Sequence, residues 1–400
     1  MMAPDRFAAL WRSLEPIGRG AGGGYHRYSW TYPDLACREW FSEEAADRGM
    51  TVETDGNGNL WAWLGDPAAG DAVVTGSHFD SVPGGGGYDG ALGIVSAFLA
   101  IDVLAEQGAR PRRPLGVVAF TEEEGARFGV ACLGSRLLTG ALDPQRAAAL
   151  TDRDGVSLGE VMKSAGADPA LLGPDPARLR RIGAFVELHV EQGRALTAPV
   201  GVASAIWPHG RWRLDFTGTG NHAGTTRMAE RQDPMLTFAC AVLGANKEAR
   251  LQGAHATVGR VSVEPNATNA IPSSVTAWLD ARAPEQSTLD SLIAAVTTRV
   301  SERAARDGTG VSVSAESVSP VIEFHAQLRD RIADLLGGAP VLPTGAGHDA
   351  GVLAAHVPTA MLFVRNPTGV SHAPQEYATD TDCAVGVDAL AAVLEELACR

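Results

Sequence analysis

The chain has 400 residues, which exceeds what a single hydrophobic core usually serves and favours two domains or one domain with a large insertion. Hydrophobic residues make up 45% of the chain and charged residues 20%, a balance that excludes fibrous and low-complexity proteins. The net charge of −14 is spread along the chain, so we expect no nucleic-acid partner. A small anionic ligand would need a local arginine or lysine in its pocket.

The first half of the chain alternates predicted strands with predicted helices. In chain order the pattern predicts helix 32–49, a hairpin over 52–63, strand 72–77, helix 90–107, strand 115–121, a helix near residue 134, polar helical segments over 143–181 and strand 182–189. This alternation is typical of βαβ units, and it predicts an α/β fold with a mostly parallel mixed sheet.

A different order of elements begins near residue 211. It predicts strand 211–218, helix 234–250, strands 256–264 and 274–283, helix 286–307 and strand 311–317. The order βαββαβ is that of a ferredoxin-like α+β domain. We therefore predict an inserted domain over 207–319 within a catalytic domain formed by 1–206 and 320–400. Helix 328–335 and strand 359–364 return to the α/β pattern.

The location of the protein is predicted from what its sequence lacks. The N-terminal residues do not show the charged region and apolar run of a secretory signal, and the longest apolar stretch, 90–101, is too short to span a bilayer. We expect a cytoplasmic protein without a membrane partner. The five cysteines are widely spaced and contain no CxxC pair, so neither a disulfide framework nor a thiolate zinc site is indicated.

Candidate metal ligands follow three of the predicted strands. His78 follows strand 72–77, the acidic run Glu122–Glu124 follows strand 115–121, and His189 ends strand 182–189. Ligands of parallel sheets bind beyond the carboxyl ends of the strands. Each residue alone has an ordinary alternative as a capping histidine, a solvated glutamate or a turn-forming aspartate. Their joint placement favours a metal centre.

The residue types match the needs of a two-metal hydrolase. Such a centre takes imidazole and carboxylate ligands, and a carboxylate outside the ligand set moves the proton. The candidate metal ligands are His78, Asp89, Glu124, His189 and His372. Glu123 is the candidate general base, and Asp80 is placed to hold the His78 imidazole. We therefore expect two divalent metal ions, which are zinc or manganese, with cobalt or nickel as alternatives. Imidazole and carboxylate ligands do not distinguish among these metals.

Seven motifs extend this interpretation along the whole chain, and they are Gly76–Val82, Gly87–Gly90, Glu123–Phe128, Glu187–Gly193, Asn221–Thr226, Asn266–Pro272 and Ser371–Pro374. In this order they resemble the amidase branch of the dinuclear aminoacylase and carboxypeptidase superfamily. That branch contains allantoate amidohydrolases, N-carbamoyl-L-amino acid hydrolases and β-ureidopropionases.

The resemblance implies a role for each candidate ligand. His78 and Glu124 would bind different metals, Asp89 would bridge them, and His189 and His372 would complete the two ligand sets. Glu123 would act first as the general base and then as the acid. The inserted domain would pair two subunits into a homodimer and close over the site.

The resemblance also implies contacts with a substrate. His222 would stabilise the developing oxyanion across the dimer, and Asn269 and Arg282 would hold the substrate carboxylate. Gln192 would make a further pocket contact, and we expect His348 to line the same pocket. Without the resemblance, Arg282 reads as an exposed arginine at a strand end, and His222 and Asn269 read as turn residues.

We therefore predict a dinuclear-metal amidohydrolase that cleaves a ureido C–N bond of a small carboxylate. Allantoate is the favoured substrate, which would release ammonia in purine catabolism. The alternatives are an N-carbamoyl-L-amino acid hydrolase, a β-ureidopropionase, a peptidase or deacylase, and a non-catalytic metal-binding descendant. The complete set of ligands and base argues against the last of these.

One position departs from the resemblance. Arg227 stands where the family commonly has proline, and it either alters the loop near His222 or adds a charge close to the substrate.

Overall fold

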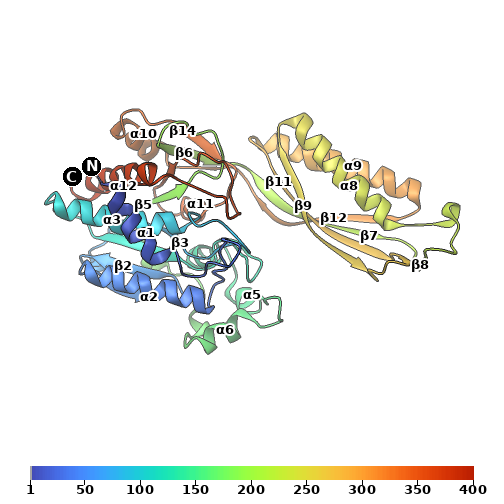
Figure 1. Cartoon of the computed structure of the whole chain (residues 1–400), viewed down its shortest axis with the longest axis horizontal. Coiled ribbons are helices and arrows are strands. Elements are labelled where there is room, and N and C mark those ends of the chain that lie inside the picture. The colour runs from blue at the N-terminus through green and yellow to red at the C-terminus, as the bar shows by residue number, and fades with distance from the viewer. Residues whose placement is uncertain (1) are drawn as a thin grey trace. The chain divides into compact units, whose positions relative to one another are not determined.

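Residues 2–400 are described here from a computed structural model, in which the chain forms two compact units (Figure 1). The core unit runs to Ser204 and resumes at Glu323, and the inserted unit comprises Ala205–Ile322. The division falls close to the boundaries expected at 206/207 and 319/320. Among residues 2–400, no helix is both long enough and apolar enough to cross a bilayer.

The core unit is built on a nine-stranded mixed sheet. Its strands in spatial order are β1 (Thr51–Thr54), β2 (Leu60–Leu64), β4 (Leu115–Phe120), β3 (Ala72–His78), β5 (Ile182–Val190), β15 (Thr359–Val364), β6 (Val200–Ile206) and β13 (Ile322–Glu323), with β14 (Val341–Thr344) paired to β6. Strands β4, β3, β5 and β15 are mutually parallel, whereas β1 and β2 pair antiparallel with their neighbours and β6 pairs antiparallel with β15. The predicted fold class is confirmed.

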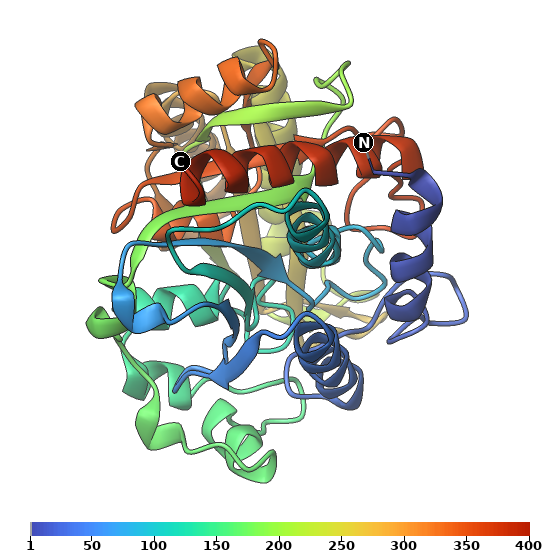
Figure 2. The same ribbon diagram turned by 90° about the vertical axis from the view of Figure 1, so that its left-hand side faces the viewer.

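Four long helices lie against the sheet (Figure 2), and they are α1 (Pro4–Leu14), α2 (Tyr32–Asp47), α3 (Ala91–Glu106) and α12 (Asp380–Ala398). Their apolar side chains form one large core with those of the sheet. Helix α3 is apolar on nearly every side and is buried along its length. Helix α1 buries Phe7, Trp11 and Leu14, which recur at helical spacing and form one apolar stripe. Neither α1 nor α12 is among the predicted elements.

Shorter helices complete the core unit, and they are η1 (Pro67–Ala69), α4 (Leu133–Thr139), α5 (Pro144–Ala148), α6 (Leu158–Ser164), η2 (Pro169–Leu171), α7 (Pro176–Leu179), α10 (Ala326–Leu335) and α11 (Asp349–Leu353). Helices α4 and α11 contact each other, and α11 also contacts β5 and β15.

Parallel pairing brings the carboxyl ends of β4, β3 and β5 to one edge of the sheet. His78 is the last residue of β3, the acidic run begins two residues after the end of β4, and His189 is the penultimate residue of β5. In β5 the side chains of Val186, Leu188 and Val190 enter the large core. Because side chains alternate along a strand, Glu187 and His189 point to the opposite face of the sheet.

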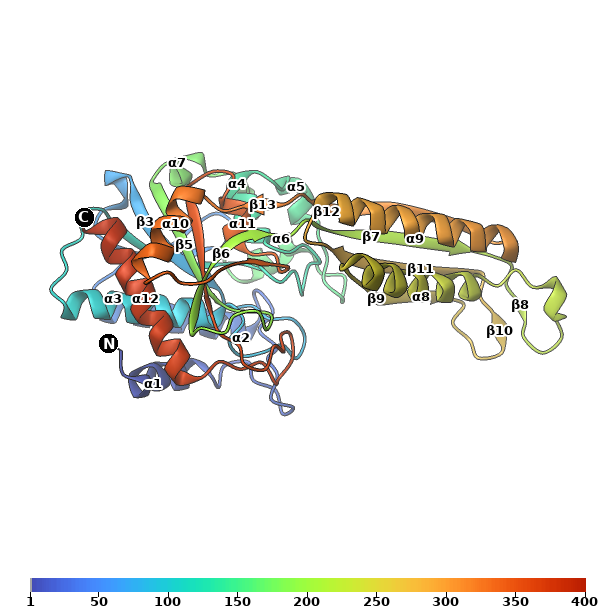
Figure 3. The same cartoon turned by 90° about the horizontal axis from the view of Figure 1, so that it is seen from above.

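The inserted unit has the predicted ferredoxin-like order. Its elements are β7 (His209–Thr217), α8 (Pro234–Gln252), β9 (His255–Glu264), β11 (Ser274–Arg282), α9 (Gln286–Asp307) and β12 (Gly310–Ser319). The four strands form an antiparallel sheet in the order β12-β7-β11-β9, and α8 and α9 lie side by side on one face of it (Figure 3). A short pair, β8 (Asn221–His222) and β10 (Ala270–Ile271), joins two loops, and η3 (Met228–Glu230) follows in the first of them.

Burial alternates along β11. Val275, Ala277, Leu279 and Ala281 are buried in the core beneath α8 and α9. The intervening side chains, among them Asp280 and Arg282, therefore project from the other face of this sheet.

Candidate functional site

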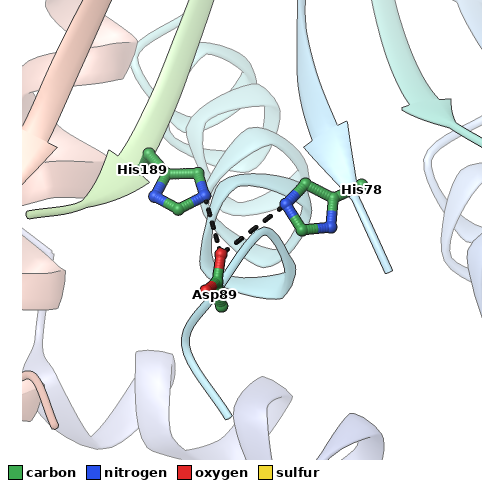
Figure 4. A group of neighbouring side chains, drawn as sticks. All are labelled: His78, Asp89 and His189. Carbon is green, nitrogen blue, oxygen red and sulfur yellow. Dashed lines mark ion pairs between the residues drawn. The ribbon is translucent and has the colours of Figure 1, made fainter. Parts of the chain in front are cut away.

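Asp89 lies between two imidazole rings at the edge of the core sheet (Figure 4). Its Oδ1 atom is 3.2 Å from His189 Nε2 and 3.7 Å from His78 Nε2. Gly90, the next residue, has φ +67°, and a Cβ atom there would lie 2.4 Å from the His78 ring. Glycine at this position therefore lets the start of α3 approach the histidine closely enough to place Asp89.

The second oxygen of Asp89 faces a different pair of side chains. Asp89 Oδ2 is 3.4 Å from His372 Nε2, and the same nitrogen is 3.4 Å from Glu124 Oε2. His372 comes from the loop after β15 and adopts a left-handed backbone with φ +56°. Asp89 is thus shared by two candidate ligand groups, one with His78 and His189 and the other with Glu124 and His372.

Asp80 holds the site differently from the expectation. The His78 imidazole makes its contact with the backbone oxygen of Asp80, at 2.9 Å from Nδ1, whereas the Asp80 carboxylate is 3.7 Å from that nitrogen. The carboxylate instead accepts hydrogen bonds of 3.0 Å from the amides of Glu123 and Glu124. The prediction that the Asp80 side chain holds the His78 imidazole is therefore wrong in its atoms. The backbone carbonyl of Asp80 holds the imidazole, and its carboxylate holds the backbone of Glu123 and Glu124.

Glu123 is buried beside this centre. Its Oε2 atom lies 3.8 Å from His78 Nε2, and its Oε1 atom accepts a hydrogen bond of 3.3 Å from the Cys132 thiol. Burial, together with the carboxylates of Asp349 and Glu124, raises the pKa of Glu123 well above its usual range. A carboxylate with a raised pKa that is close to the candidate ligands is suited to proton transfer.

The three acidic side chains of the run have separate roles. Glu122 is buried with φ +56°, and its Oε1 atom accepts hydrogen bonds from the amides of Arg127 and Phe128. Glu122 therefore closes the turn that presents Glu123 and Glu124 to the site.

The pKa values of the two histidines beside Asp89 move in opposite directions. Burial lowers the pKa of His78 to about 4. Burial acts in the same sense on His189, but the hydrogen bond and the charge of Asp89 outweigh it and raise the pKa of His189 to about 9. Burial would raise the pKa of Asp89, but the hydrogen bond from His189 and the charges of the nearby histidines lower it.

Two further carboxylates support the candidate ligands and were not predicted. Glu376 Oε1 accepts hydrogen bonds from the amides of Tyr88 (3.0 Å) and Asp89 (2.9 Å), and its Oε2 accepts one from Ser371 Oγ (3.0 Å). Glu187 accepts hydrogen bonds from Ser77 Oγ (2.7 Å) and from the backbone of α11. Glu187 is two residues before His189, so both side chains lie on one face of β5. This spacing is visible in the sequence and could have identified Glu187.

The two pocket residues predicted in the core unit lie beside the same ligand groups. Gln192 Nε2 donates hydrogen bonds to Asp89 Oδ2 (3.1 Å) and Ser371 Oγ (3.2 Å). The ring of His348 packs edge-on against that of His189, with 4.5 Å between centroids. Both side chains therefore contact candidate metal ligands.

The donor set fits two divalent cations. Glu124 Oε1 is buried and accepts no hydrogen bond within the described part of the chain, so it has a lone pair available to a cation. The side chains of Asp80, Asp89, Glu123 and Glu124 are each at most 8% exposed, and their mutual repulsion contributes to the raised pKa values of Glu123 and Glu124. Two positive ions on the imidazole and carboxylate groups would offset this repulsion.

The structure separates the three predicted substrate residues of the inserted unit. His222 and Asn269 lie together, because His222 pairs with Ala270 in the β8–β10 ladder and the amide of Ala223 donates to the Asn269 carbonyl at 3.0 Å. Arg282 lies at the opposite end of β11, where Nε and Nη2 donate to the Asp280 carboxylate at 2.8 and 3.2 Å.

Comparison with known proteins gives concordant matches. Residues 74–396 match the profile of Peptidase family M20/M25/M40. The chain is 36% identical over 405 residues to an N-carbamoyl-L-amino acid amidohydrolase of Geobacillus stearothermophilus, covering 97% of this chain and 98% of the relative. It is 32% identical over 396 residues to the allantoate amidohydrolase of Escherichia coli (strain K12), covering 96% of each. The crystal structure of a hydantoinase/carbamoylase family amidase from Burkholderia vietnamiensis superposes with a TM-score of 0.91 at 32% identity, covering 100% of this chain and 98% of that one.

Proposed function

Because the chain belongs to Peptidase family M20/M25/M40, we propose that it is a metal-dependent amidohydrolase that cleaves a ureido C–N bond of a small carboxylate. Allantoate is the leading substrate, and ammonia is a product. The observation that carries the proposal is the position of Asp89 between two candidate ligand groups, with Glu123 beside them. His78, His189 and Asp89 would hold one cation, and Asp89, Glu124 and His372 the other.

The chain's own residues move the proton in this proposal. Two bound cations would supply Lewis acidity that activates a water molecule and polarises the ureido carbonyl. Glu123 accepts a proton from the attacking water and returns it to the departing nitrogen, for which its raised pKa is suited. The backbone of Glu123 is fixed by Asp80, so this carboxylate is positioned before the substrate arrives.

His222 is proposed as the donor to the developing oxyanion. Its Nδ1 atom accepts hydrogen bonds from the amides of Gly224 (3.0 Å) and Thr225 (3.2 Å). In the neutral ring the proton therefore lies on Nε2, which becomes a hydrogen-bond donor. A donor fixed in advance by its backbone is what stabilisation of a transition-state charge requires.

A substrate site that uses both Arg282 and His222 needs two copies of the chain. Strand β11 has nine residues, so its ends lie about 26 Å apart. Arg282 is at one end, and the loops of His222 and Asn269 adjoin the other. No small carboxylate spans that distance. We therefore assign Arg282 to the copy whose metals act on the substrate, and His222 and Asn269 to a second copy.

The inserted unit offers a surface for such a pair. Strand β9 is at an edge of its sheet, with Val261 50% exposed, and α8 packs beside it. Leu236, Leu243 and Leu251 project from α8 at 46%, 73% and 69% exposure and recur at helical spacing. An unpaired strand edge next to an exposed apolar stripe is suited to edge-to-edge association with a second copy.

A second candidate function is hydrolysis of N-carbamoyl-L-amino acids. It is favoured by the 36% identity to the amidohydrolase of that specificity, compared with 32% to the allantoate enzyme. Both reactions would use the same metals and the same base. They differ in the part of the substrate outside the ureido group, which the pocket must bind.

The test is a substrate panel with ammonia detection. Protein reconstituted with manganese or zinc would be given allantoate, an N-carbamoyl-L-amino acid and N-carbamoyl-β-alanine, with chelator-treated protein as the control. We expect metal-dependent ammonia release, greatest with allantoate. Greatest release from the N-carbamoyl-L-amino acid would replace the leading substrate with the second candidate, and no release from any of them would overturn the proposed function.

A further inference from the structure

Arg227 is a cation that the proposed reaction leaves without a role. Its side chain is 84% exposed, and it makes an ion pair of 3.9 Å with Glu230, which is itself 62% exposed. Exposed pairs at such a separation contribute little to stability. The planar guanidinium therefore keeps hydrogen-bond donors for an external anion.

The loop that carries Arg227 is fixed to the backbone of His222. The amide and the hydroxyl of Thr226 both donate to the His222 carbonyl, at 3.2 and 2.8 Å. Arg231 Nη2 donates to the carbonyls of Ala223 (2.6 Å) and Thr226 (3.0 Å). The chain therefore turns back on itself and places Arg227 next in sequence to a residue bonded to His222.

We propose that Arg227 binds a second anionic group of the substrate, so that among N-carbamoyl amino acids those with a second carboxylate are hydrolysed in preference to their neutral analogues. The inference rests on the proposed function, because it takes His222 as the residue that meets the reacting carbonyl. Because Arg227 and His222 lie on one hydrogen-bonded loop, the anion held by Arg227 is inferred to belong to the same substrate molecule. Arg282 is left for the first carboxylate, and Arg227 determines selectivity through the second.

The net negative charge of the protein explains why a second substrate anion needs a local cation such as Arg227. A chain with a net charge of −14 repels a substrate with two negative charges more strongly than one with a single charge. A guanidinium group binds a carboxylate through two parallel hydrogen bonds, which offsets this repulsion locally and selects the planar anion over a neutral amide.

The test compares two substrates of nearly equal shape, N-carbamoyl-L-glutamate and N-carbamoyl-L-glutamine, whose side chains end in a carboxylate and an amide. The proteins are the wild type, Arg227→Gln, Arg227→Lys and, as a matched control, Arg306→Gln, which removes another exposed arginine of the inserted unit. The readout is the ratio of kcat/KM for the two substrates, measured by ammonia release.

We expect the wild type to favour the glutamate compound by about tenfold, which corresponds to one charge-assisted hydrogen bond. Arg227→Gln should bring the ratio close to one, Arg227→Lys should retain part of the preference, and Arg306→Gln should retain all of it. A wild-type ratio near one, or an unchanged ratio in Arg227→Gln, would overturn this inference while leaving the proposed function intact. If the wild type hydrolyses neither compound, the inference fails, and the proposed function fails with it only if nothing in the first panel is hydrolysed either.

Discussion

The backbone amide of Asp89 donates a 2.9 Å hydrogen bond to Glu376 Oε1, and this contact ties the shared carboxylate to the loop that carries His372. Glu376 also accepts a hydrogen bond from Ser371, the residue before His372. One buried side chain therefore sets the position of two candidate ligands that are far apart in the sequence.

Replacing Glu376 should loosen the metal centre. Glu376→Ala removes the acceptor for the Tyr88 and Asp89 amides, and we expect metal affinity to fall by about 10- to 100-fold. Glu376→Gln retains an oxygen acceptor and should bind metal more tightly than Glu376→Ala. The measurement is metal content after dialysis against graded chelator, with Glu39→Ala on exposed α2 surface as the control. Equal metal retention by Glu376→Ala and the wild type would contradict this role.

Metal binding should release protons at neutral pH. The pKa of His189 in the metal-free protein is raised to about 9, so the imidazole carries a proton below that value and loses it only as the pH rises through about 9. A cation must displace this proton, so metal affinity should increase with pH up to about 9. Calorimetric titration at pH 7 in buffers of different ionisation enthalpy should give buffer-dependent heats, and His189→Asn should reduce the release. Heats that are the same in every buffer would refute the prediction.

The exposed leucines of α8 predict a dimer, and a single charged side chain placed among them should disrupt it. Leu243→Glu would bury a carboxylate against the apolar surface of the partner copy, so we expect a monomer in sedimentation velocity. Leu171→Glu changes a similarly exposed leucine of the core unit and should leave the assembly unchanged. A wild-type monomer, or a Leu243→Glu dimer as stable as the wild type, would exclude this surface.

If His222 acts on the partner's substrate, two inactive variants should complement each other. Mixed dimers of His222→Ala and Glu123→Gln contain one site with both defects and one with neither. Equal mixing after subunit exchange should therefore restore about a quarter of the wild-type activity. Each variant alone serves as the control. A mixture that is no more active than its components would place His222 and Glu123 in the same copy's site.

Much of the fold was predictable because the spacing of apolar residues indicates whether a segment is a strand or a helix. The alternation in β11 and the apolar length of α3 each indicate one type of element, and the order βαββαβ identified the inserted unit. The α1 stripe of Phe7, Trp11 and Leu14 was a usable signal that the prediction missed. Helix α12 was harder to predict, since it is buried on most sides and lacks a polar face that would mark its period.

The candidate site was predictable where it depends on strand ends. His78, Glu124 and His189 could be grouped because parallel strands end at one edge, and the family resemblance is confirmed by the full-length matches. The support from Glu376 and the carbonyl contact of Asp80 depend on loop conformations that no periodicity encodes. The preference for allantoate stays a prediction.

In the proposed reaction, Glu123 moves the proton at a metal centre that other residues hold. Glu123→Gln keeps the size of the side chain and leaves His78, Asp89, Glu124, His189 and His372 in place. The decisive measurement is ammonia release by this variant together with its metal content. We expect turnover to fall by about 10²- to 10⁴-fold while both metals remain bound. Wild-type turnover by a fully metallated Glu123→Gln protein would contradict the account.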